Sequence, residues 1–395
     1  AFSIPAKCAY NLISAPDRAV YKITEAPMPF IPEHSEDIVR CMKCGNCQNT
    51  CPVFSVTLQE SRVARGRIRL LKAVINGEIE LTDGVQESLM TCLQCDACSL
   101  TCPPGVPVNE LLLKAKEAML RAGKPLPVIQ KSINQGIRDE ANPFSQPRTE
   151  RGAWLPPELR RPRAAEYLLH AGCAISYASN RIGKAVIRIM EQAGLDFTLM
   201  GDLEECCGDP LYRMGDVDAG EKQVNRNKEE WAKLGVKFVV TPCAGCFKAF
   251  KEHYGDDIVP LHITQLFARL ISEGKLVFTK PFKKKVIYFD GCDIGRHGKV
   301  FDEPRQVLSA IPGLTLMEYT QNRENSVCCG GPILGSHPDL ARKIAAGRVR
   351  EAQDLGADIL AVACPTCMLN LKEGANYAGL KLDIQDMNAI VMRAL

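Results

Sequence analysis

The feature that most constrains this chain is its cysteine content. Its 395 residues include 19 cysteines, and an odd number cannot all pair within one chain. Disulfide frameworks serve small exported domains that lack a core, whereas a chain of this length can bury two or three cores. Residues 1–18 are mixed in character and interrupted by proline, so no export signal is expected there. Closely spaced thiols therefore predict metal ligation and a cytoplasmic location.

Charge and hydropathy exclude two further classes. The 49 basic side chains nearly balance 46 acidic ones, whereas a nucleic-acid-binding surface normally carries clustered excess Lys and Arg. The longest apolar stretches, such as residues 359–363, are far shorter than the roughly 20 residues that cross a bilayer. We expect no nucleic-acid partner and no transmembrane segment, so that any attachment to a membrane would pass through a partner subunit.

Eight cysteines form two copies of the motif C-x2-C-x2-C-x3-C, each followed by proline. This is the spacing of ferredoxins with two cubane [4Fe–4S] clusters, in which three thiolates hold one cluster and the fourth reaches the other. A zinc site would instead need isolated cysteine pairs. The first cubane set is predicted to be Cys41, Cys44, Cys47 and Cys102, and the second cubane set Cys92, Cys95, Cys98 and Cys51.

The segments around these motifs have helical periodicity. Residues 61–75 place Val, Ile and Leu near one helix face, and residues 108–120 form a second helical run. A small β-hairpin ferredoxin has no room for such helices, so we predict an α-helical ferredoxin domain over residues 36–136, preceded by an extension over 1–35. Residues 137–163 are rich in proline and basic charge, which predicts a linker.

The C-terminal part contains one cysteine plan twice. The spacings are C-x32-CC-x35-C-x2-C and C-x35-CC-x34-C-x2-C, and corresponding cysteines lie 119 to 122 residues apart. Such a period indicates a duplicated unit. The first five-cysteine set is Cys173, Cys206, Cys207, Cys243 and Cys246, and the second five-cysteine set is Cys292, Cys328, Cys329, Cys364 and Cys367.

Each copy has the pattern strand, helix, strand, paired cysteines, helix, strand, helix, which predicts a parallel sheet covered by helices over residues 164–275 and again over 276–395. The fold class is therefore α-helical ferredoxin followed by two tandem α/β repeats. The cysteines fall at the carboxyl ends of strands, where open α/β sheets bind ligands. Five thiolates exceed the four ligands of zinc and favour an iron–sulfur centre with additional protein ligands.

Taken together, the motifs resemble the heterodisulfide reductase D-subunit family, whose cysteine-rich repeats are termed CCG domains. The resemblance covers about residues 36–393, with the x34 gap one residue shorter than the family pattern. It implies that each five-cysteine set binds one noncubane [4Fe–4S] cluster, and that a substrate disulfide is cleaved between the two clusters.

The expected function is an oxidoreductase subunit that passes electrons through two cubane clusters to two noncubane clusters and reduces a disulfide. The alternative is an electron relay without a disulfide substrate, as in related subunits of glycolate and glycerol 3-phosphate dehydrogenases. Several such relatives have incomplete five-cysteine sets, so the complete sets here favour the reductase. Residues 330–337 depart from the glycine-rich run that many relatives carry after the paired cysteines, which leaves the substrate open.

Outside the cysteine sets, His297 follows Cys292 by five residues and is a candidate proton donor to a departing thiolate; the alternative is a packed histidine that supports the cluster ligands. Arg296 and Arg305 are candidates either to attract an anionic substrate or to balance the charge of the clusters. Cys8 lies outside every motif and is predicted to be a free or buried thiol.

The sequence also indicates how electrons enter. No G-x-G-x-x-G follows a predicted strand and no G-x4-G-K-[ST] occurs, so neither a dinucleotide nor a P-loop fingerprint is present. We therefore expect an electron-donor subunit, either a flavoprotein or a membrane cytochrome.

Overall fold

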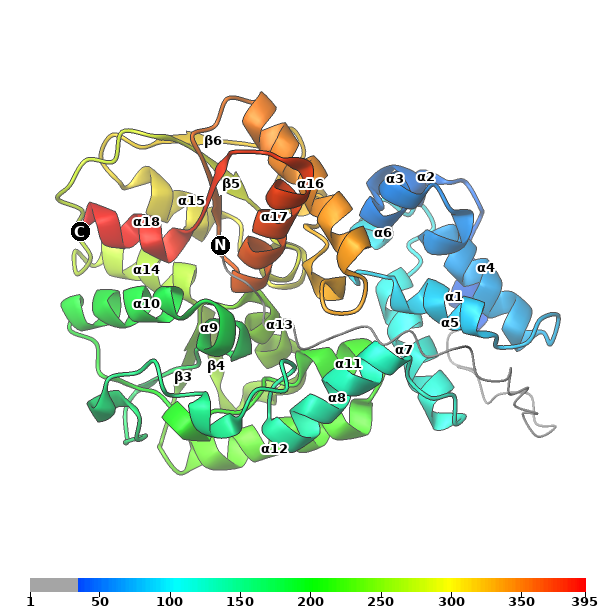
Figure 1. Ribbon diagram of the computed structural model, residues 1–395, viewed down its shortest axis with the longest axis horizontal. Coiled ribbons are helices and arrows are strands. Elements are labelled where there is room, and N and C mark those ends of the chain that lie inside the picture. Colours follow the sequence, from blue (N-terminus) through cyan, green and yellow to red (C-terminus); the bar gives the residue numbers. More distant parts are fainter. Residues whose placement is uncertain (1–34) are drawn as a thin grey trace.

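The computed structural model describes residues 35–395, so that Cys8 lies outside the described residues. The chain forms a helical N-terminal lobe and two sheets of four parallel strands each (Figure 1). The sheets have the same strand order, β2-β1-β3-β4 and β6-β5-β7-β8, as expected of a duplicated unit. The predicted fold class is confirmed.

The helical lobe is built on amphipathic helices. Ile68 and Leu71 of α4 are buried with Leu89, Leu111 and Met119 in one core. Helix α5 begins after Thr82, whose hydroxyl accepts the backbone N–H of Val85 at 3.3 Å, which satisfies a donor that would otherwise lack a partner. The helices are α1 (Ser35–Val39), α2 (Asn46–Thr50), α3 (Pro52–Thr57), η2 (Glu60–Arg62), α4 (Ala64–Ile75), α5 (Asp83–Met90), α6 (Ala97–Leu100), α7 (Val108–Arg121) and α8 (Val128–Glu140).

The first repeat follows the predicted alternation, continues it with the strand β4 and the helix α14, and contains further short helices. Its strands are β1 (Tyr167–Leu169), β2 (Phe197–Thr198), β3 (Phe238–Thr241) and β4 (Val259–His262). Its helices are α9 (Cys173–Ala178), α10 (Asn180–Gln192), η5 (Gly201–Leu203), α11 (Asp209–Met214), α12 (Val217–Ala232), α13 (Ala244–His253), η6 (Gly255–Asp257) and α14 (Ile263–Ser272).

The second repeat has the same additions. Its strands are β5 (Lys285–Phe289), β6 (Thr315–Met317), β7 (Ile359–Val362) and β8 (Asp383–Asp386). Its helices are the π-helix η7 (Asp293–His297), α15 (Asp302–Ser309), η8 (Arg323–Asn325), η9 (Gly331–Ile333), α16 (Pro338–Asp354), α17 (Pro365–Ala378) and α18 (Met387–Ala394). The predicted pattern lacked β4 and β8 because neither is an apolar run. Strand β4 contains proline, and β8 reads Asp-Ile-Gln-Asp.

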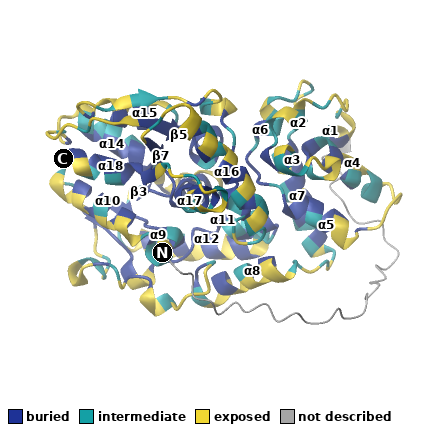
Figure 2. Ribbon diagram, turned by 45° about the horizontal axis from the view of Figure 1, so that its top comes forward, coloured by how far each residue is buried: buried dark blue, intermediate teal, exposed yellow. Residues whose placement is uncertain are grey.

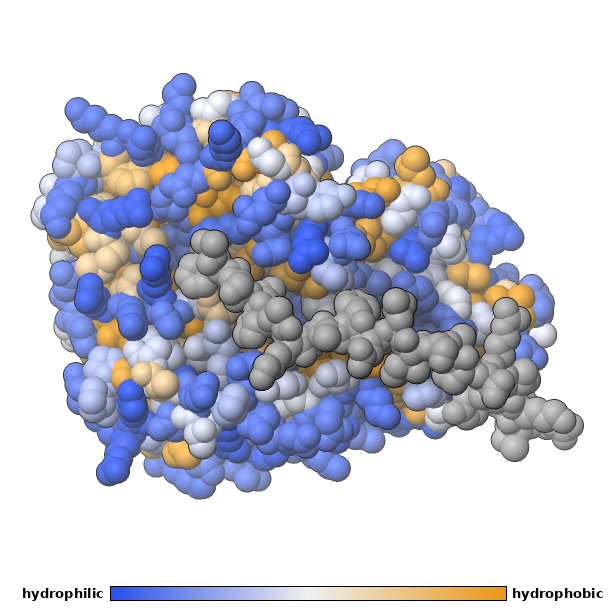
Figure 3. Space-filling model, in the orientation of Figure 1, coloured by the Kyte–Doolittle hydropathy of each residue, from blue (hydrophilic) through white to orange (hydrophobic). Residues whose placement is uncertain are grey.

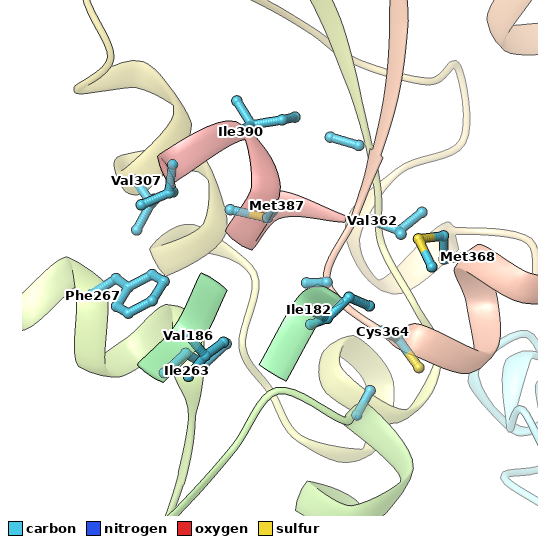
Figure 4. Packing of buried hydrophobic residues seen from close by; sticks show 14 of the residues in the cluster. Ile182, Val186, Ile263, Phe267, Val307, Val362, Cys364, Met368, Met387 and Ile390 are labelled. Carbon is cyan, nitrogen blue, oxygen red and sulfur yellow. The ribbon is translucent and has the colours of Figure 1, made fainter. Parts of the chain in front are cut away.

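The two repeats share one continuous hydrophobic core (Figure 2). Helix α10 of the first repeat packs against α18 of the second, and α14 packs against α15. Each aliphatic side chain that is fully buried between these helices stabilises the fold by roughly 1.5–3 kcal/mol. The many such side chains at this interface hold the two repeats together. Figure 4 shows this packing through Ile182, Val186, Ile263, Phe267, Val307, Met387 and Ile390, with Cys364 beside it.

The segment predicted as a linker is packed against the first repeat. It contains η3 (Arg148–Glu150) and η4 (Pro157–Leu159), and it buries Arg151 and Leu155. The predicted domain limits remain a prediction.

The helical lobe also contacts both repeats, because α7 lies against α11 and α3 lies against α16. None of the helices among residues 35–395 has the length and apolar character that crossing a bilayer requires. The face drawn in Figure 3 is mainly hydrophilic, with small apolar patches.

Candidate iron–sulfur sites

The first cubane set surrounds a hollow in the helical lobe. Its four cysteines line an open space of about 370 Å³, with Ile68 and Val106 among the apolar walls. Gly45 precedes α2 with a φ of 90°, a conformation that an L side chain adopts only with strain, and this turn lets the loop curve around the hollow. Cys44 is exposed, so this site lies nearest to solvent.

The second cubane set surrounds another hollow, of about 410 Å³, open to solvent and walled by Val53, Ala64 and Leu112. Its members come from both motifs: Cys51 ends the first motif, while the other three begin the second. Helices α2 and α6 are in contact, and this contact brings each motif's fourth cysteine to the opposite hollow. Burial raises the pKa of the Cys51 thiol to about 11.

The first five-cysteine set is buried where the strands of the first sheet end. The thiol of Cys206 contacts those of Cys173 and Cys207, and Cys246 contacts Cys207 and Cys243. Gly172 has a φ of 81°, and a Cβ there would lie 3.0 Å from the sulfur of Cys246. Glycine therefore lets the backbone approach the sulfurs closely.

The second five-cysteine set repeats this arrangement. The sulfurs of Cys292 and Cys328 lie 3.6 Å apart, and those of Cys329 and Cys367 lie 3.2 Å apart. The thiol of Cys364 contacts that of Cys367. Hydrogen bonds with the neighbouring thiols of Cys328 and Cys367 lower the pKa of Cys329 to about 5.

Two further contacts connect the sets. The thiol of Cys95, in the second cubane set, contacts that of Cys328 in the second repeat. The thiols of Cys243 and Cys364 contact each other across the interface between the repeats. Sulfur contacts therefore run without interruption from the second cubane set, through the second repeat, to the first.

The residues present fit iron–sulfur clusters better than free thiols or single ions. Each five-cysteine set is fully buried, and burying unpaired thiolates without a metal is costly. A buried guanidinium nitrogen, Nη2 of Arg296, has no hydrogen-bond partner among residues 35–395, and the charge of this guanidinium interacts with the sulfurs of Cys95, Cys292 and Cys328. Within residues 35–395, no three His, Cys, Asp or Glu side chains converge on a point suited to one metal ion, whereas the thiolates of a cluster bind separate iron atoms.

The predicted site residues other than cysteines are placed as follows. Nε2 of His297 lies 3.0 Å from the carbonyl oxygen of Gln94, and Nδ1 lies 3.4 Å from the carboxylate of Glu252. Both ring nitrogens thus contact groups other than cysteine, and a role as proton donor remains a prediction. The guanidinium of Arg305 pairs with Asp290 and Glu318 at 2.8 and 2.7 Å, which neutralises the charge that was predicted to attract an anion.

Two arginines near the sites were missed in the sequence. Nη1 of Arg151 donates to the sulfur of Cys173 at 3.5 Å, and Nη2 pairs with the buried carboxylate of Glu204 at 2.8 Å. Arg213 connects all three parts of the molecule, because it contacts the carbonyl of Leu93 and pairs with Asp209 and Asp293. Neither residue belongs to a motif, and Arg151 lies in a proline-rich segment, so no sequence signal distinguished them.

Fold and sites together define an iron–sulfur protein in which a dicluster domain precedes a duplicated cysteine-rich domain. The family of the cysteine-rich domain (CCG) matches residues 167–251 and 286–372, and that of the 4Fe-4S dicluster domain matches residues 37–106. The chain is 30% identical to the D subunit of the dihydromethanophenazine:CoB–CoM heterodisulfide reductase of Methanosarcina barkeri, over 90% of this chain and 93% of that protein. The chain belongs to the heterodisulfide reductase D-subunit family.

Other relatives show how widely this arrangement occurs. The EtfAB:quinone oxidoreductase of Syntrophomonas wolfei is 27% identical over 93% of this chain, which spans 60% of that protein. A crystal structure of a hypothetical protein from Helicobacter pylori has the same fold, with a TM-score of 0.57 at 10% identity, covering 86% of this chain and 68% of that one. The chain is accordingly an iron–sulfur oxidoreductase component related to the heterodisulfide reductase D subunits.

Proposed function

We propose that this chain carries electrons from a donor protein through two cubane clusters to two noncubane [4Fe–4S] clusters, where a disulfide is reduced. The two cubane sets would hold the cubane clusters and the two five-cysteine sets the noncubane clusters. When bound, these clusters supply one-electron transfer and iron atoms that bind sulfur.

The observation that carries this proposal is the continuity of the sulfur contacts. Cys95 and Cys328 bring a cubane set against the second repeat, and Cys243 and Cys364 bring the two repeats together. A relay that ended at a cubane cluster would need neither contact. Two adjoining five-cysteine sets suit a substrate that has two sulfur atoms to be reduced.

The overall reaction balances with the electrons that the donor supplies. One disulfide, two electrons and two protons give two thiols, and the S–S bond is the only bond that breaks. The role of the protein is to keep both five-cysteine sets buried and adjacent, so that the two halves are held apart from solvent until both electrons have arrived. Because the Methanosarcina barkeri relative is one subunit of a heterodisulfide reductase, we propose that a separate subunit, a flavoprotein or a membrane cytochrome, is the electron donor. This chain would be cytoplasmic, with any attachment to a membrane made through that subunit.

Metal analysis and EPR of the full chain, purified without oxygen, test the proposal. Four clusters give about 16 iron atoms per chain, and the noncubane signal should respond to added thiol. Cys367→Ser should remove about four iron atoms and part of the thiol-responsive signal, whereas Cys8→Ser, outside every motif, should change neither. Cubane signals alone, with no response to thiols, would contradict the proposal.

The second candidate function is an electron relay for a flavin-dependent dehydrogenase. It is favoured by the relative named EtfAB:quinone oxidoreductase, whose name mentions no disulfide. A relay would accept electrons from a donor flavoprotein and pass them on, but the chemically reduced chain would not consume small disulfides. Disulfide turnover with reduced viologen as the donor therefore separates the two functions.

A further inference from the structure

Arg296 occupies the junction between the helical lobe and the second repeat. It lies in the π-helix η7, four residues after Cys292, and is 4% exposed. Its Nε donates to the carbonyl of Cys95 at 2.5 Å, and its Nη1 donates to the carbonyls of Glu324, at 3.1 Å, and Ser326. The side chain is thereby fixed between a cysteine of the second cubane set and the second five-cysteine set.

One end of this guanidinium has no partner in the part of the chain that the structure describes. Nη2 is buried and makes no hydrogen bond to any of residues 35–395, which is costly for a charged donor. Burial lowers the pKa of Arg296, but the sulfurs of Cys95, Cys292 and Cys328 raise it above the usual value. The guanidinium therefore interacts with sulfurs of the second cubane set and of the second five-cysteine set, and the side chain of Cys95 is within its hydrogen-bonding reach.

Arg296 differs from three other arginines near the sites, whereas Arg67, buried beside the second cubane hollow, likewise forms no ion pair within residues 35–395. Arg151 pairs with Glu204, Arg213 with Asp209 and Asp293, and Arg305 with Asp290 and Glu318. Arg296 forms no ion pair with a carboxylate of residues 35–395, and its partners there are backbone carbonyls. Its positive charge is therefore available to interact with the cysteine sulfurs and with a cluster bound to them.

We propose that Arg296 is a positioning residue that donates from Nη2 to a cluster at this junction and raises the reduction potentials of the second cubane and of the second repeat's cluster. A buried cation stabilises the more negative, reduced state of a nearby cluster, and salt screens this interaction little. The arginines beside the first cubane set and the first five-cysteine set, Arg65 and Arg151, are paired with Glu60 and Glu204, so electrons would be drawn toward the junction. The inference rests on the proposed cluster assignment.

Potentiometric EPR titration of the full chain tests this role. In Arg296→Gln, one of the two cubane signals and one thiol-responsive signal should shift to lower potential. At a fixed potential, the ratio of oxidised to reduced cluster should rise about tenfold, which corresponds to about 59 mV for a one-electron couple. The other cubane signal stays in place and serves as an internal reference. The matched control is Lys299→Gln, which removes the same charge from an exposed position three residues away and should move neither signal.

Three outcomes decide the matter. If Arg296→Gln keeps its iron but no potential moves, the proposal is wrong. If that variant loses iron, Arg296→Lys, which keeps the charge without the planar fork, carries the test: both potentials should stay within about threefold of the wild-type ratio of oxidised to reduced cluster, and a tenfold downward shift with the charge retained refutes the role of the cation. If the wild type shows no thiol-responsive signal, the proposed disulfide chemistry fails, while the shift of one cubane signal still reports on Arg296 beside Cys95.

Discussion

Replacing Arg151 with methionine should destabilise the first repeat strongly. Arg151 and Glu204 are 1% and 4% exposed and are joined through Nε and Nη2 of the guanidinium at 3.2 and 2.8 Å. The same carboxylate accepts the backbone N–H groups of Ala171 and Gly172, just before Cys173. Arg151→Met keeps much of the side-chain volume but leaves the carboxylate without its cation.

Removing one partner of a buried ion pair costs about 3–5 kcal/mol, because the remaining charge stays desolvated. With an unfolding entropy of about 2.1 cal/mol/K per residue, that loss lowers the apparent Tm of a cooperatively unfolding chain of 395 residues by about 4–6 °C. The control is Arg163→Met in the same proline-rich segment. Arg163 pairs with Asp196, but the two side chains are 57% and 60% exposed, and such pairs contribute about 0–1 kcal/mol.

Thermal unfolding followed by circular dichroism, without oxygen and at one scan rate, measures the difference. A second comparison isolates the pair: the double variant Arg151→Met/Glu204→Gln removes the stranded charge and should recover part of the lost stability. The reasoning is refuted if Arg151→Met lowers the Tm no more than Arg163→Met does, or if the double variant is less stable than Arg151→Met alone.

Three further predictions concern single positions. Gly330 has a φ of 86° directly after the paired cysteines of the second repeat, so Gly330→Ala should destabilise the fold by about 1–2 kcal/mol and lower its iron content. The control is Gly347→Ala in the middle of α16, where a Cβ meets no atom within 4 Å; it should change neither stability nor iron content. Because Cys44 is exposed and the five-cysteine sets are buried, brief exposure to air with a chelator should bleach a cubane EPR signal before any thiol-responsive signal, and simultaneous loss would contradict this order. His297→Gln should slow disulfide turnover without changing iron content if the imidazole donates a proton, and unchanged turnover would remove His297 from the mechanism.

The sequence predicted the cysteine sets because their spacing is local and repeated. Crossing of Cys51 and Cys102 between the two hollows follows from motif spacing alone, and the structure brings those sulfurs into the hollows expected. Sheet topology was predictable as far as apolar runs marked the strands, and it failed at β8, whose polar residues pair with β7 through the backbone. Ligand roles within these sets remain predictions.

Contacts between distant segments were beyond prediction. Nothing in the spacing indicated that Cys95 would touch Cys328, because that contact depends on how α3 packs against α16. Arg151 was assigned to a linker because proline and basic charge usually mark exposed chain, yet a carboxylate 53 residues away draws it into the interior. Arg305 was a candidate either to attract an anion or to balance cluster charge, because nothing in the sequence showed that Asp290 and Glu318 would pair with it.

The junction between the three parts has a physical consequence for electron transfer. Arg213 joins Leu93 of the helical lobe to Asp209 of the first repeat and Asp293 of the second. His297 connects the same three parts through Gln94 and Glu252. These bonds are buried or partly buried, so breaking any one of them leaves a charge or a carbonyl without its partner. The lobe is therefore held in one position relative to both repeats, and the contact between Cys95 and Cys328 does not depend on diffusion of one domain toward another.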